Sequence, residues 1–498
     1  MSLLHEAHNF VINGGEFVGQ QNVSVHHSIN LNGSSGIDIL LEASAPEAAL
    51  DAGERYYAPS CYPGTREKYI EDITEWARAI TSNSIGPPIL WIRGPVGVGK
   101  SALAQTCAQK VKDAGHLGAA FFFSINGRQK DHTRLFPTLA YQLSTAHPDF
   151  RESVNRRALN DKTLVKKTMK AQFESLIIEP LRELREQDKD VGRKVIFIDG
   201  LDECESKDAQ VEIIKLIASS VQTKSTPFFW AIFGRAEPHI LSTFKLDHIM
   251  LHCSFLHLSI TRNDDREIEH YLRGCFKDIL RRRNMVLSSP WPKDEDIRRL
   301  VDAAAGLFAY SATVLRFIDK HSFSGFKETL QAVLEIIAQP GAHPISPFAD
   351  LDRLYTHILQ QVPDDIVPAM RLLLTFITRA DSSLNGNWDV GLICNMLGIS
   401  ETVFKAICGH FQAVMVYQEP LPLHIPESGI DLTRSYYDQV PSFEPNSSLS
   451  GRLLGIYGTI NLLHKSFKDF LLDSHRSFGF SVGGSNLEVL ERMAQQYI

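Results

Sequence analysis

The chain has 498 residues, of which 44% are hydrophobic and 22% are charged, a composition typical of a soluble globular protein with about three or four domains. The net charge is −7 and the two signs are mixed along the chain, which argues against a duplex nucleic-acid interface, since that would need a basic face. The chain has no apolar run of the roughly 18 residues that span a membrane, no secretory signal and no Cys-x-x-Cys pair, so we expect a cytoplasmic protein without a membrane span or a zinc site.

Residues 1–50 are predicted to form an N-terminal arm that is β-prone or disordered. Between residues 9 and 36 polar and apolar residues alternate, Asn and Gly are frequent, and Glu16 is the single carboxylate. Uncharged segments of this kind can stack in register as amyloid, and the alternative is a plain disordered or capping arm. A helix-prone stretch follows at 37–50, and residues 51–88 are predicted to be a linker with a helix at 65–80.

From residue 89 to residue 262, apolar strands alternate with helices. We predict strands at 89–92, 117–123, 195–198, 228–233 and 255–260, and helices at 101–112, 135–143, 173–184 and 209–219. Parallel strands need helical crossovers, so this alternation predicts an α/β domain whose parallel sheet is covered by helices on both faces.

Beyond residue 264 strands become scarce. Helices are predicted at 265–276, 294–318 and 327–337, which indicates an all-α region over 263–345. A helical block at 351–377 is followed by short helices and the strand-like segments 413–417 and 459–463, a pattern typical of a small winged helix within 346–475. The polar stretch 435–451 is predicted to be a long loop, and residues 476–498 a tail.

The segment between the first strand and the first long helix fits the phosphate-binding pattern G-x-x-x-x-G-K-[ST]. Glycines let the backbone curl so that its N–H groups converge on phosphate oxygens at a helix N-terminus. Lys100 is expected to reach the β- and γ-phosphates, and the Ser101 hydroxyl to bind Mg²⁺. The predicted phosphate-binding residues are Gly94, Pro95, Val96, Gly97, Val98, Gly99, Lys100, Ser101 and Ala102.

Acidic residues follow the strand at 195–198. We expect this strand to lie beside the nucleotide strand, so that Asp199 points at the magnesium, whereas the alternative is an ordinary buried strand that ends in Asp. Asp202 and Glu203 add two carboxylates, and either could orient or deprotonate the attacking water. Arg235 follows the strand at 228–233 and is expected to contact the γ-phosphate, unless it is a surface loop arginine.

These segments resemble the NACHT class of STAND NTPases, especially the fungal relatives of NOD-like receptors. The resemblance covers about residues 55–475 and rests on Cys61–Arg66 (CYPGTR), Trp91–Ser101 (WIRGPVGVGKS), Leu135–Leu143 (LFPTLAYQL), Ile198–Glu203 (IDGLDE), Gly306–Tyr310 (GLFAY), Leu351–Tyr355 (LDRLY) and His464–Leu471 (HKSFKDFL). It implies a P-loop NTPase domain at 89–262, a helical lid at 263–345 and a winged-helix region at 346–475. It also implies a closed ADP-bound resting form that exchanges to ATP, opens and forms a homo-oligomer.

In many relatives a histidine near the winged-helix motif contacts the ADP phosphate, which implies this role for His464; the alternative is a packed or surface histidine. Two features depart from the family. Relatives often carry Gly-x-Pro in the lid with the proline against adenine, whereas here Phe308 follows Gly306-Leu307, which leaves the adenine contact open. Relatives usually continue into sensor repeats, so we expect a short form or one whose repeats were lost or cut off.

The leading hypothesis is a nucleotide-dependent signalling switch in innate-immunity-like or nonself-recognition signalling, with an unknown effector protein downstream. It would bind ATP or ADP with Mg²⁺ and hydrolyse ATP slowly; the sequence does not distinguish ATP from GTP. A P-loop motor or kinase is one alternative. The other is a DNA-binding regulator with a winged helix, against which stands the segment 389–418, with Lys405 as its single lysine and no arginine.

Overall fold

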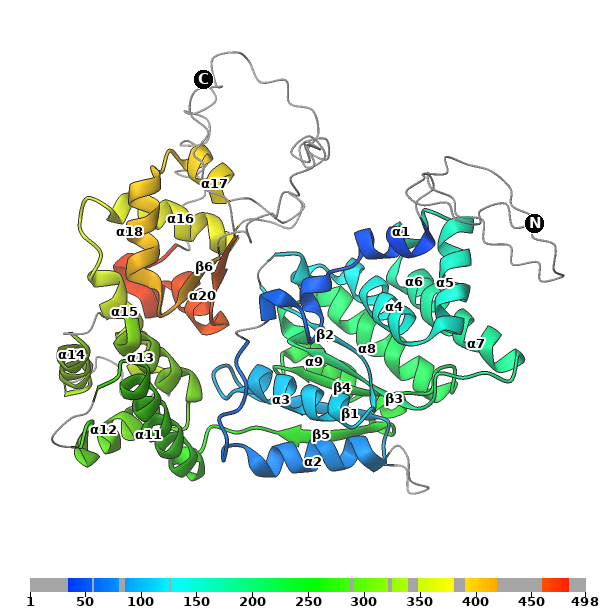
Figure 1. Ribbon diagram of the computed structural model, residues 1–498, viewed down its shortest axis with the longest axis horizontal. Helices are drawn as coiled ribbons and strands as arrows, with labels where there is room; N and C mark the ends of the chain where they lie inside the picture. The colour runs from blue at the N-terminus through cyan, green and yellow to red at the C-terminus, as the bar shows by residue number, and fades with distance from the viewer. Residues whose placement is uncertain are drawn as a thin grey trace, which may run out of the picture.

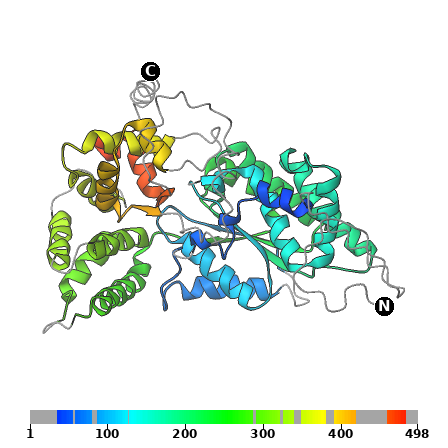
Figure 2. The same ribbon diagram turned by 45° about the horizontal axis from the view of Figure 1, so that its top comes forward.

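The computed structural model describes residues 35–55, 58–79, 86–125, 127–285, 290–320, 325–338, 348–379, 390–418 and 459–482 (Figure 1). The β-prone part of the N-terminal arm, with its amyloid alternative, and the loop predicted at 435–451 lie outside these residues. Figure 1 shows an α/β part on the right, the helices α11 to α14 at the lower left, and α16 to α18 with β6 and α20 at the upper left. Figure 2 shows the same separation from a second direction.

The α/β part contains a five-stranded sheet in which every pairing is parallel, as the alternation of strands and helices predicts. Its strands are β1 (Ile89–Arg93), β2 (Leu117–Phe122), β3 (Lys194–Asp199), β4 (Phe228–Gly234) and β5 (Cys253–His257). Four of the predicted strands agree with these bounds to within one residue. The fifth was predicted to start two residues and to end three residues too late, because the apolar segment continues past the last residue that pairs with β1.

The strand order is β2-β3-β4-β1-β5, and it corrects one prediction. We expected the strand that ends in Asp199 to lie beside the nucleotide strand, but β4 lies between them, since it pairs with β3 on one side and with β1 on the other. In a parallel sheet the carboxyl ends of neighbouring strands meet at one edge. Asp199 therefore still reaches the loop after β1, across the end of one intervening strand.

Helices cover both faces of the sheet, and side chains along each strand alternate between two buried clusters. Leu90 and Ile92 of β1 pack under α2 (Glu67–Arg78) and α3 (Lys100–Asp113). Ile89 and Trp91 face the opposite way, where the Trp91 ring stacks on Phe244 with 4.3 Å between centroids. That second face is covered by α4 (Leu135–Ala146), α6 (Met169–Phe173), α7 (Glu179–Glu186), α8 (Lys207–Gln222) and α9 (Pro238–Phe244). A π-helical turn (Glu174–Ile178) joins α6 to α7. Two helices, α5 (Pro148–Asn160) and α10 (Asp247–Met250), were not predicted.

The end of the predicted N-terminal arm belongs to the α/β body. Helix α1 (Gly36–Ala43) and a 3₁₀ turn (Pro46–Ala48) contribute Leu40, Ala45 and Ala48 to the cluster on the second face of the sheet. Ser35 begins α1 with a capping box, in which its side chain accepts the Asp38 N–H and the Asp38 carboxylate accepts the Ser35 N–H.

The chain continues into α11 (Asp265–Arg282), α12 (Asp294–Ala304), α13 (Phe308–Lys320) and α14 (Phe326–Ala338). The single helix predicted over 294–318 is wrong, because α12 ends at Ala305 and Gly306, both with left-handed backbone (φ 48° and 85°). A side chain at Gly306 would stand 2.7 Å from the Thr261 carbonyl oxygen, so the break needs glycine. The break leaves the first turn of α13 next to the loop that follows β1.

The C-terminal helices and strands share one hydrophobic cluster with α11 to α14, from Ile268 to Val482. They are α15 (Ala349–Gln360), α16 (Val367–Arg379), α17 (Val390–Leu397), α18 (Glu401–Phe411), β6 (Met415–Gln418), β7 (Thr459–Leu462), α20 (Lys465–Leu472) and α21 (Ser474–Ser477). β6 and β7 form an antiparallel pair, so α20 directly follows the second strand of a two-stranded sheet.

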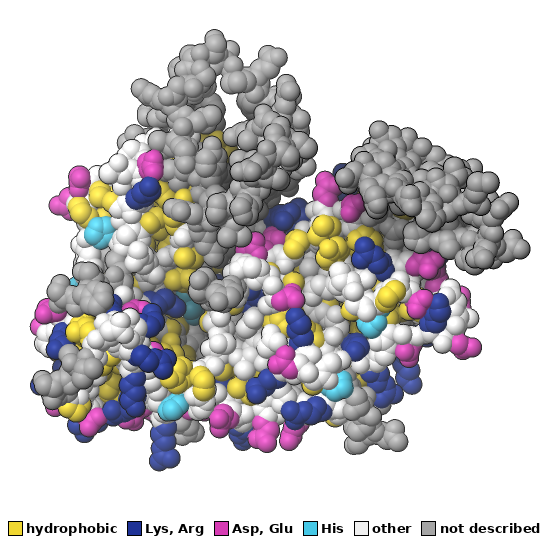
Figure 3. All heavy atoms as spheres, viewed as in Figure 1, with side chains coloured by type: hydrophobic (Ala, Val, Ile, Leu, Met, Phe, Trp, Pro, Cys, Tyr) yellow, Lys and Arg dark blue, Asp and Glu magenta, His cyan; other side chains and the backbone are white. Residues whose placement is uncertain are grey.

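No single helix in the described ranges is long and apolar enough to cross a membrane; one pair, α17 with α18, meets the length and composition test together but is bent by 114°. On the face drawn in Figure 3, Lys and Arg side chains are interspersed with Asp and Glu. This mixture of signs agrees with the distribution of charge along the sequence.

Candidate nucleotide site

The predicted phosphate-binding loop joins β1 to α3. Gly97 and Gly99 have φ of 85° and 90°, which turns successive peptide units in the way that glycine allows. Within the described part of the chain, no N–H of Val96, Gly97, Val98 or Gly99 donates a hydrogen bond. These donors and the first turn of α3 are therefore available to an anion.

Five carbonyl oxygens of the same loop accept hydrogen bonds from protein donors. Lys100 Nζ donates to the oxygens of Gly94 (2.9 Å) and Pro95 (2.8 Å). The Ala309 N–H, in the first turn of α13, donates to Gly97 O at 3.0 Å. Val98 O accepts a hydrogen bond from Arg66 Nη2 at 3.1 Å, and Gly99 O accepts one from the Leu103 N–H at 3.0 Å. With these five acceptors bonded to protein groups, the loop leaves its N–H donors for a ligand.

Lys100 is partly buried at the start of α3, close to the acidic residues that follow β3. Burial lowers its pKa to about 8, although the negative charges of Asp202, Asp199 and Glu203 oppose the shift. A lysine with this pKa is still mostly protonated at neutral pH, and it gains if a phosphate supplies further negative charge. This placement agrees with the predicted role of Lys100 as a phosphate ligand.

Asp199 and Ser101 have the donor set for Mg²⁺. The Asp199 carboxyl is buried at the end of β3, and its Oδ1 has no hydrogen-bond partner among the described residues. Burial raises the pKa of Asp199 to about 6, against a hydrogen bond from Ser101 and the nearby charges of Arg55 and Lys100. A buried, unpartnered carboxylate oxygen beside a hydroxyl at the P-loop fits Mg²⁺, which prefers oxygen ligands; bound there, the ion would neutralise phosphate charge.

Asp202 is occupied by protein cations. Its Oδ1 accepts the backbone N–H of Arg235 at 3.0 Å, and its Oδ2 lies 2.8 Å from Lys465 Nζ and 3.2 Å from Arg235 Nε. Burial alone would raise the pKa of Asp202, but Lys465, Lys100 and Arg235 together lower it. A carboxylate with both oxygens paired and a low pKa is a poor proton acceptor.

Glu203 has the opposite environment, although it is the next residue. Its Oε2 accepts the N–H of Ile125 at 3.2 Å. Burial, followed by repulsion from Asp202, raises the pKa of Glu203 to about 7. A carboxyl group with this pKa gains and loses its proton near neutral pH, as a general base requires. Of the two carboxyl groups that the sequence could not rank, Glu203 is thus the one that can accept a proton near neutral pH.

Arg235 lies at the end of β4, as predicted, and pairs with acids on both sides. Its Nη2 lies 2.8 Å from Asp469 Oδ2 in α20, while its Nε faces Asp202. Burial would lower the pKa of Arg235, but Asp469 and Asp202 raise it above the usual value. We call these four residues, Asp202, Arg235, Lys465 and Asp469, the α20 salt-bridge network. The network connects two strand ends of the sheet with the first turns of α20.

His464 is the N-cap residue of α20. Its Nδ1 accepts the Ser466 N–H at 3.2 Å and lies 2.6 Å from Ser466 Oγ, which also contacts the Tyr355 hydroxyl at 2.8 Å. A backbone N–H can only donate, so Nδ1 is unprotonated and the neutral ring carries its proton on Nε2. Burial, then the charges of Arg316, Lys100 and Arg235, lower the pKa of His464 to about 3. His464 is thus a neutral hydrogen-bond donor close to Lys100.

Sequence reasoning missed three residues of this site: Arg66, Lys465 and Asp469. Arg66 is 3% exposed; besides its bond to Val98 O, its Nη1 lies 3.0 Å from Asp264 Oδ1 and its guanidinium 4.7 Å from the Phe308 ring centre. The segment that contains Arg66 was noted, but no role followed from it. The four-residue spacing of Lys465 and Asp469 could have indicated one face of a helix.

A cavity of about 390 Å³ opens beside the loop at the carboxyl ends of β1, β4 and β5. Its lining residues are Arg93, Gly94, Pro95, Arg235, Ala236, Glu237 and His257. The site thus extends from the phosphate loop toward the end of the edge strand.

A sequence profile of the family described as Nephrocystin 3, N-terminal, matches residues 64–235, from the segment before α2 to the end of β4. A comparison with curated protein sequences finds no match. Among solved structures, the chain is similar to the Aeropyrum pernix ORC2 protein in its ADP form, with 13% identity, 73% of this chain and 89% of that chain covered, and a TM-score of 0.35.

The chain is also similar to CDC6P from Pyrobaculum aerophilum, with 13% identity, 74% of this chain and 92% of that chain covered, and a TM-score of 0.35. For AMPPCP-bound DnaA from Aquifex aeolicus the identity is 14%, the covered shares are 67% and 83%, and the TM-score is 0.29. At these scores the function has to be argued from the site itself. A glycine loop of this geometry, between the first strand of a parallel sheet and its helix, binds nucleotide phosphates, so the chain is a nucleotide-binding protein with a P-loop NTPase fold.

Proposed function

We propose that this protein is a nucleotide-gated signalling switch of the STAND and NACHT kind. It binds ADP in a closed resting form and ATP in an open form, hydrolyses ATP slowly to reset itself, and acts through a homo-oligomer and an effector protein. In this proposal α11 to α14 act as the lid, and α16 to α20 with β6 and β7 act as the winged-helix region. The signalling role extends the family resemblance described above.

One observation carries the proposal: residues of α20 contact the phosphate end of the nucleotide site. Lys465 Nζ lies 2.8 Å from Asp202 Oδ2 and also donates to the Asp202 carbonyl oxygen at 2.9 Å. Asp469 pairs with Arg235, the residue predicted to contact the γ-phosphate. The C-terminal region is thus bound to the groups that would distinguish ATP from ADP.

The γ-phosphate and Asp469 would compete for Arg235. When ADP is bound, Arg235 is free to pair with Asp469, and the neutral Nε2–H of His464 is suited to a terminal phosphate oxygen. When ATP is bound, the γ-phosphate offers Arg235 a stronger anion and α20 loses that partner. Glu203 would then activate the attacking water, and hydrolysis would restore the pairing of Arg235 with Asp469.

The energies involved are large enough for a switch. Moving a population from 1:99 to 99:1 takes about 5.5 kcal/mol of differential binding. Removing one partner of a buried ion pair typically costs about 3–5 kcal/mol, and Asp202 is 3% exposed in its pair with Lys465. The Arg235–Asp469 pair is more exposed, at 19% and 29% of the two side chains, so its loss would contribute less than loss of a fully buried pair, and the contacts of the γ-phosphate with Lys100 would add the remainder.

The test measures what nucleotide the protein holds and how α20 responds. Purified full-length protein is denatured and the released nucleotide is identified by chromatography, beside the Lys100→Ala variant. We expect bound ADP in the wild type and none in the variant. Hydrogen exchange of residues 465–472 is then compared with ADP and with a non-hydrolysable ATP analogue, and we expect faster exchange with the analogue.

Two results would count against the switch. Equal exchange of α20 with both nucleotides would mean that the γ-phosphate does not act on this helix. Turnover above about 1 s⁻¹, in the range of working enzymes, would favour a motor or a kinase instead. Salt-sensitive retention on DNA would revive the reading of the C-terminal region as a DNA-binding regulator.

A further inference from the structure

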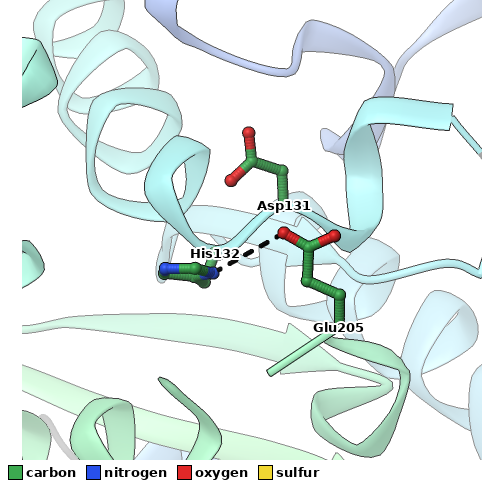
Figure 4. Close-up of side chains that lie close together, drawn as sticks. All are labelled: Asp131, His132 and Glu205. Carbon is green, nitrogen blue, oxygen red and sulfur yellow. Dashed lines mark ion pairs between the residues drawn. The ribbon is translucent and has the colours of Figure 1, made fainter. Parts of the chain in front are cut away.

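Three metal-ligating side chains lie together away from the nucleotide loop (Figure 4). Asp131, His132 and Glu205 each offer one ligand atom, and these atoms all lie within 4.8 Å of one another. His132 Nδ1 and Glu205 Oε1 face each other at 3.9 Å. We propose that this triad binds a divalent transition-metal ion, at a site separate from the Mg²⁺ of the nucleotide.

Two loops hold the triad in place. Asp131 precedes a 3₁₀ turn (His132–Arg134), and its Oδ1 accepts the Thr133 N–H at 2.9 Å and the Thr133 hydroxyl at 2.7 Å. Glu205 follows the acidic turn after β3, and its N–H donates to the Lys130 carbonyl oxygen at 3.1 Å. The ligands thus come from loops that are hydrogen-bonded to each other, so little ordering is left to the metal.

Of the three ligand side chains, His132 offers a ring nitrogen that has no hydrogen-bond partner in the described part of the chain. His132 Nδ1 is buried and makes no hydrogen bond among the described residues. Its 3.9 Å separation from Glu205 Oε1 is too long for a hydrogen bond. It is close to the spacing of two ligands on one ion, about 3.3–3.6 Å for bonds of 2.0–2.2 Å in tetrahedral geometry.

Asp131 would offer its second oxygen, Oδ2, since Oδ1 accepts both bonds from Thr133. Oδ2 forms an ion pair with Arg134 Nε at 3.3 Å. The same guanidinium also donates to the carbonyl oxygens of Ser44 (3.1 Å) and Glu42 (3.3 Å). Asp131 Oδ2 therefore keeps lone pairs for a metal, although the charge of Arg134 will weaken binding to some extent.

The ligand set points to a class of ion. One imidazole and two carboxylates suit Zn²⁺, Co²⁺ or Mn²⁺, with water completing the coordination, whereas Mg²⁺ prefers oxygen ligands alone. The sequence argument against zinc considered cysteine spacing and does not apply to a site built from His, Asp and Glu. Glu205 lies two residues after Glu203, so an ion bound here would fix the loop that carries the proposed base.

Metal binding to the full-length protein tests the site directly. Chelator-treated protein is titrated with Co²⁺, followed by its visible absorption, and with Zn²⁺, followed by calorimetry. The variants are His132→Ala and the isosteric Glu205→Gln, with circular dichroism to check folding. The matched control is His248→Ala, an exposed histidine on α10, and Lys100→Ala separates this site from the nucleotide site.

We expect one ion per chain in the wild type, with unchanged affinity in His248→Ala and in Lys100→Ala. The affinity for Co²⁺ and Zn²⁺ should fall at least about 10- to 100-fold in His132→Ala and in Glu205→Gln. A loss of this size is usual when a residue that only hydrogen-bonds to a metal ligand is removed, and removal of the ligand itself should cost more. Saturating Mg²⁺–ADP should leave the Co²⁺ spectrum unchanged. No Co²⁺ or Zn²⁺ binding at about 100 μM, or equal affinity in His132→Ala and the wild type, would overturn the proposal.

Discussion

Two regions of the chain meet at the proposed nucleotide site, and they reach it in different ways. The phosphate loop, Gly94–Ser101, is a continuous segment whose donors converge because two glycines adopt positive φ. The α20 segment, His464–Asp469, reaches the same place from 263 residues away, through the pair between Lys465 and Asp202. The conformation of the loop is determined by its own residues, whereas the position of the α20 segment depends on the packing of the whole C-terminal half.

The difference separates two properties of the protein. In the proposed switch, local contacts of the loop would decide whether a nucleotide is bound at all. The α20 salt-bridge network, which is remote in sequence, would decide what binding does to the rest of the molecule. Substitutions in the two regions should therefore have separable effects, and the following experiments test that separation.

The sharpest test of the local region is Lys100→Ala. Lys100 bonds only to carbonyl oxygens of its own loop, so the fold should survive its removal. A charge-assisted contact to two phosphates is lost, and we expect at least about 100-fold weaker binding of ATP and ADP. Titration with a fluorescent nucleotide analogue measures the affinity. A decrease of less than about threefold would mean that the loop does not bind the phosphates through this lysine.

Glu203→Gln separates nucleotide binding, which the loop would provide, from hydrolysis. We expect ATP affinity to change little and hydrolysis to fall by about 100-fold or more, because the general base is lost. Asp202→Asn is the matched control. It should weaken the contact with Lys465 and change the hydrogen exchange of α20 more than it changes the affinity for nucleotide. If instead Asp202→Asn abolished turnover and Glu203→Gln did not, the assignment of the base would be reversed.

The same residue predicts a pH dependence. Hydrolysis by the wild type should increase between pH 6 and pH 8, as Glu203 loses its proton with a pKa of about 7. The pKa of Glu203 is higher in the folded protein than the value of about 4.3 in the unfolded chain, so the protonated carboxyl group favours the folded state. This contribution to stability is fully present below about pH 4.3 and is lost as the pH rises through 7. The melting temperature of Glu203→Gln should therefore exceed that of the wild type at pH 8 by more than at pH 5.5, which calorimetry can measure.

The remote region is tested by a double-mutant cycle on Arg235 and Asp469. Asp469→Asn should speed ADP release several-fold while leaving the phosphate loop intact, because Asp469 contacts Arg235 and not the loop. The coupling energy between Arg235→Gln and Asp469→Asn should be about 1–3 kcal/mol, as found for residues in one charged network. The surface pair of Lys405 and Glu401 on α18 provides a control cycle, with a coupling of about 0.5 kcal/mol or less. Equal coupling in both cycles would show that the α20 network is an ordinary surface contact.

The smallest effect concerns His464. With a pKa lowered to about 3, its ring should stay neutral from pH 5 to pH 8, and its proton should reside on Nε2. Nitrogen NMR of histidine-labelled protein reports both properties. His464→Ala should reduce ADP affinity by a few-fold and ATP affinity less, since one neutral hydrogen bond is worth about 1 kcal/mol. A ring that titrates near pH 6.5 would contradict this environment.

The contrast between the two regions also explains what could be predicted from the sequence. The strands, the glycine loop and the position of Asp199 at a strand end follow from patterns within about ten residues. The strand order did not, because no local feature of β3 excludes β4 from the place beside it. The break between α12 and α13 was missed although Gly306 marked it, because the apolar period continued across the glycine.

The choice between Asp202 and Glu203 shows the limit most clearly. The two residues are adjacent and chemically alike, so nothing in their own segment distinguishes them. Their environments differ because Lys465 and Arg235 form ion pairs with Asp202 and leave Glu203 buried beside it. Only the folded chain brings these cations to Asp202, so the base could not be identified from the sequence.

One backbone contact has a consequence for evolution. The Gly97 carbonyl oxygen accepts a hydrogen bond from the N–H of Ala309, in the first turn of α13. The peptide group between Gly97 and Val98, which belongs to the phosphate loop, is therefore also bonded to α13. Both atoms of this hydrogen bond belong to the main chain, so exchange of the Ala309 side chain leaves the contact in place, whereas a side chain at Gly97 would be strained by the positive φ and would stand 3.2 Å from Ala309 Cβ. Movement of the loop on phosphate arrival would pull on α13 whatever residues surround it. Communication of this kind can persist while the sequences of relatives drift, and proline at 309 is the simple substitution that removes it.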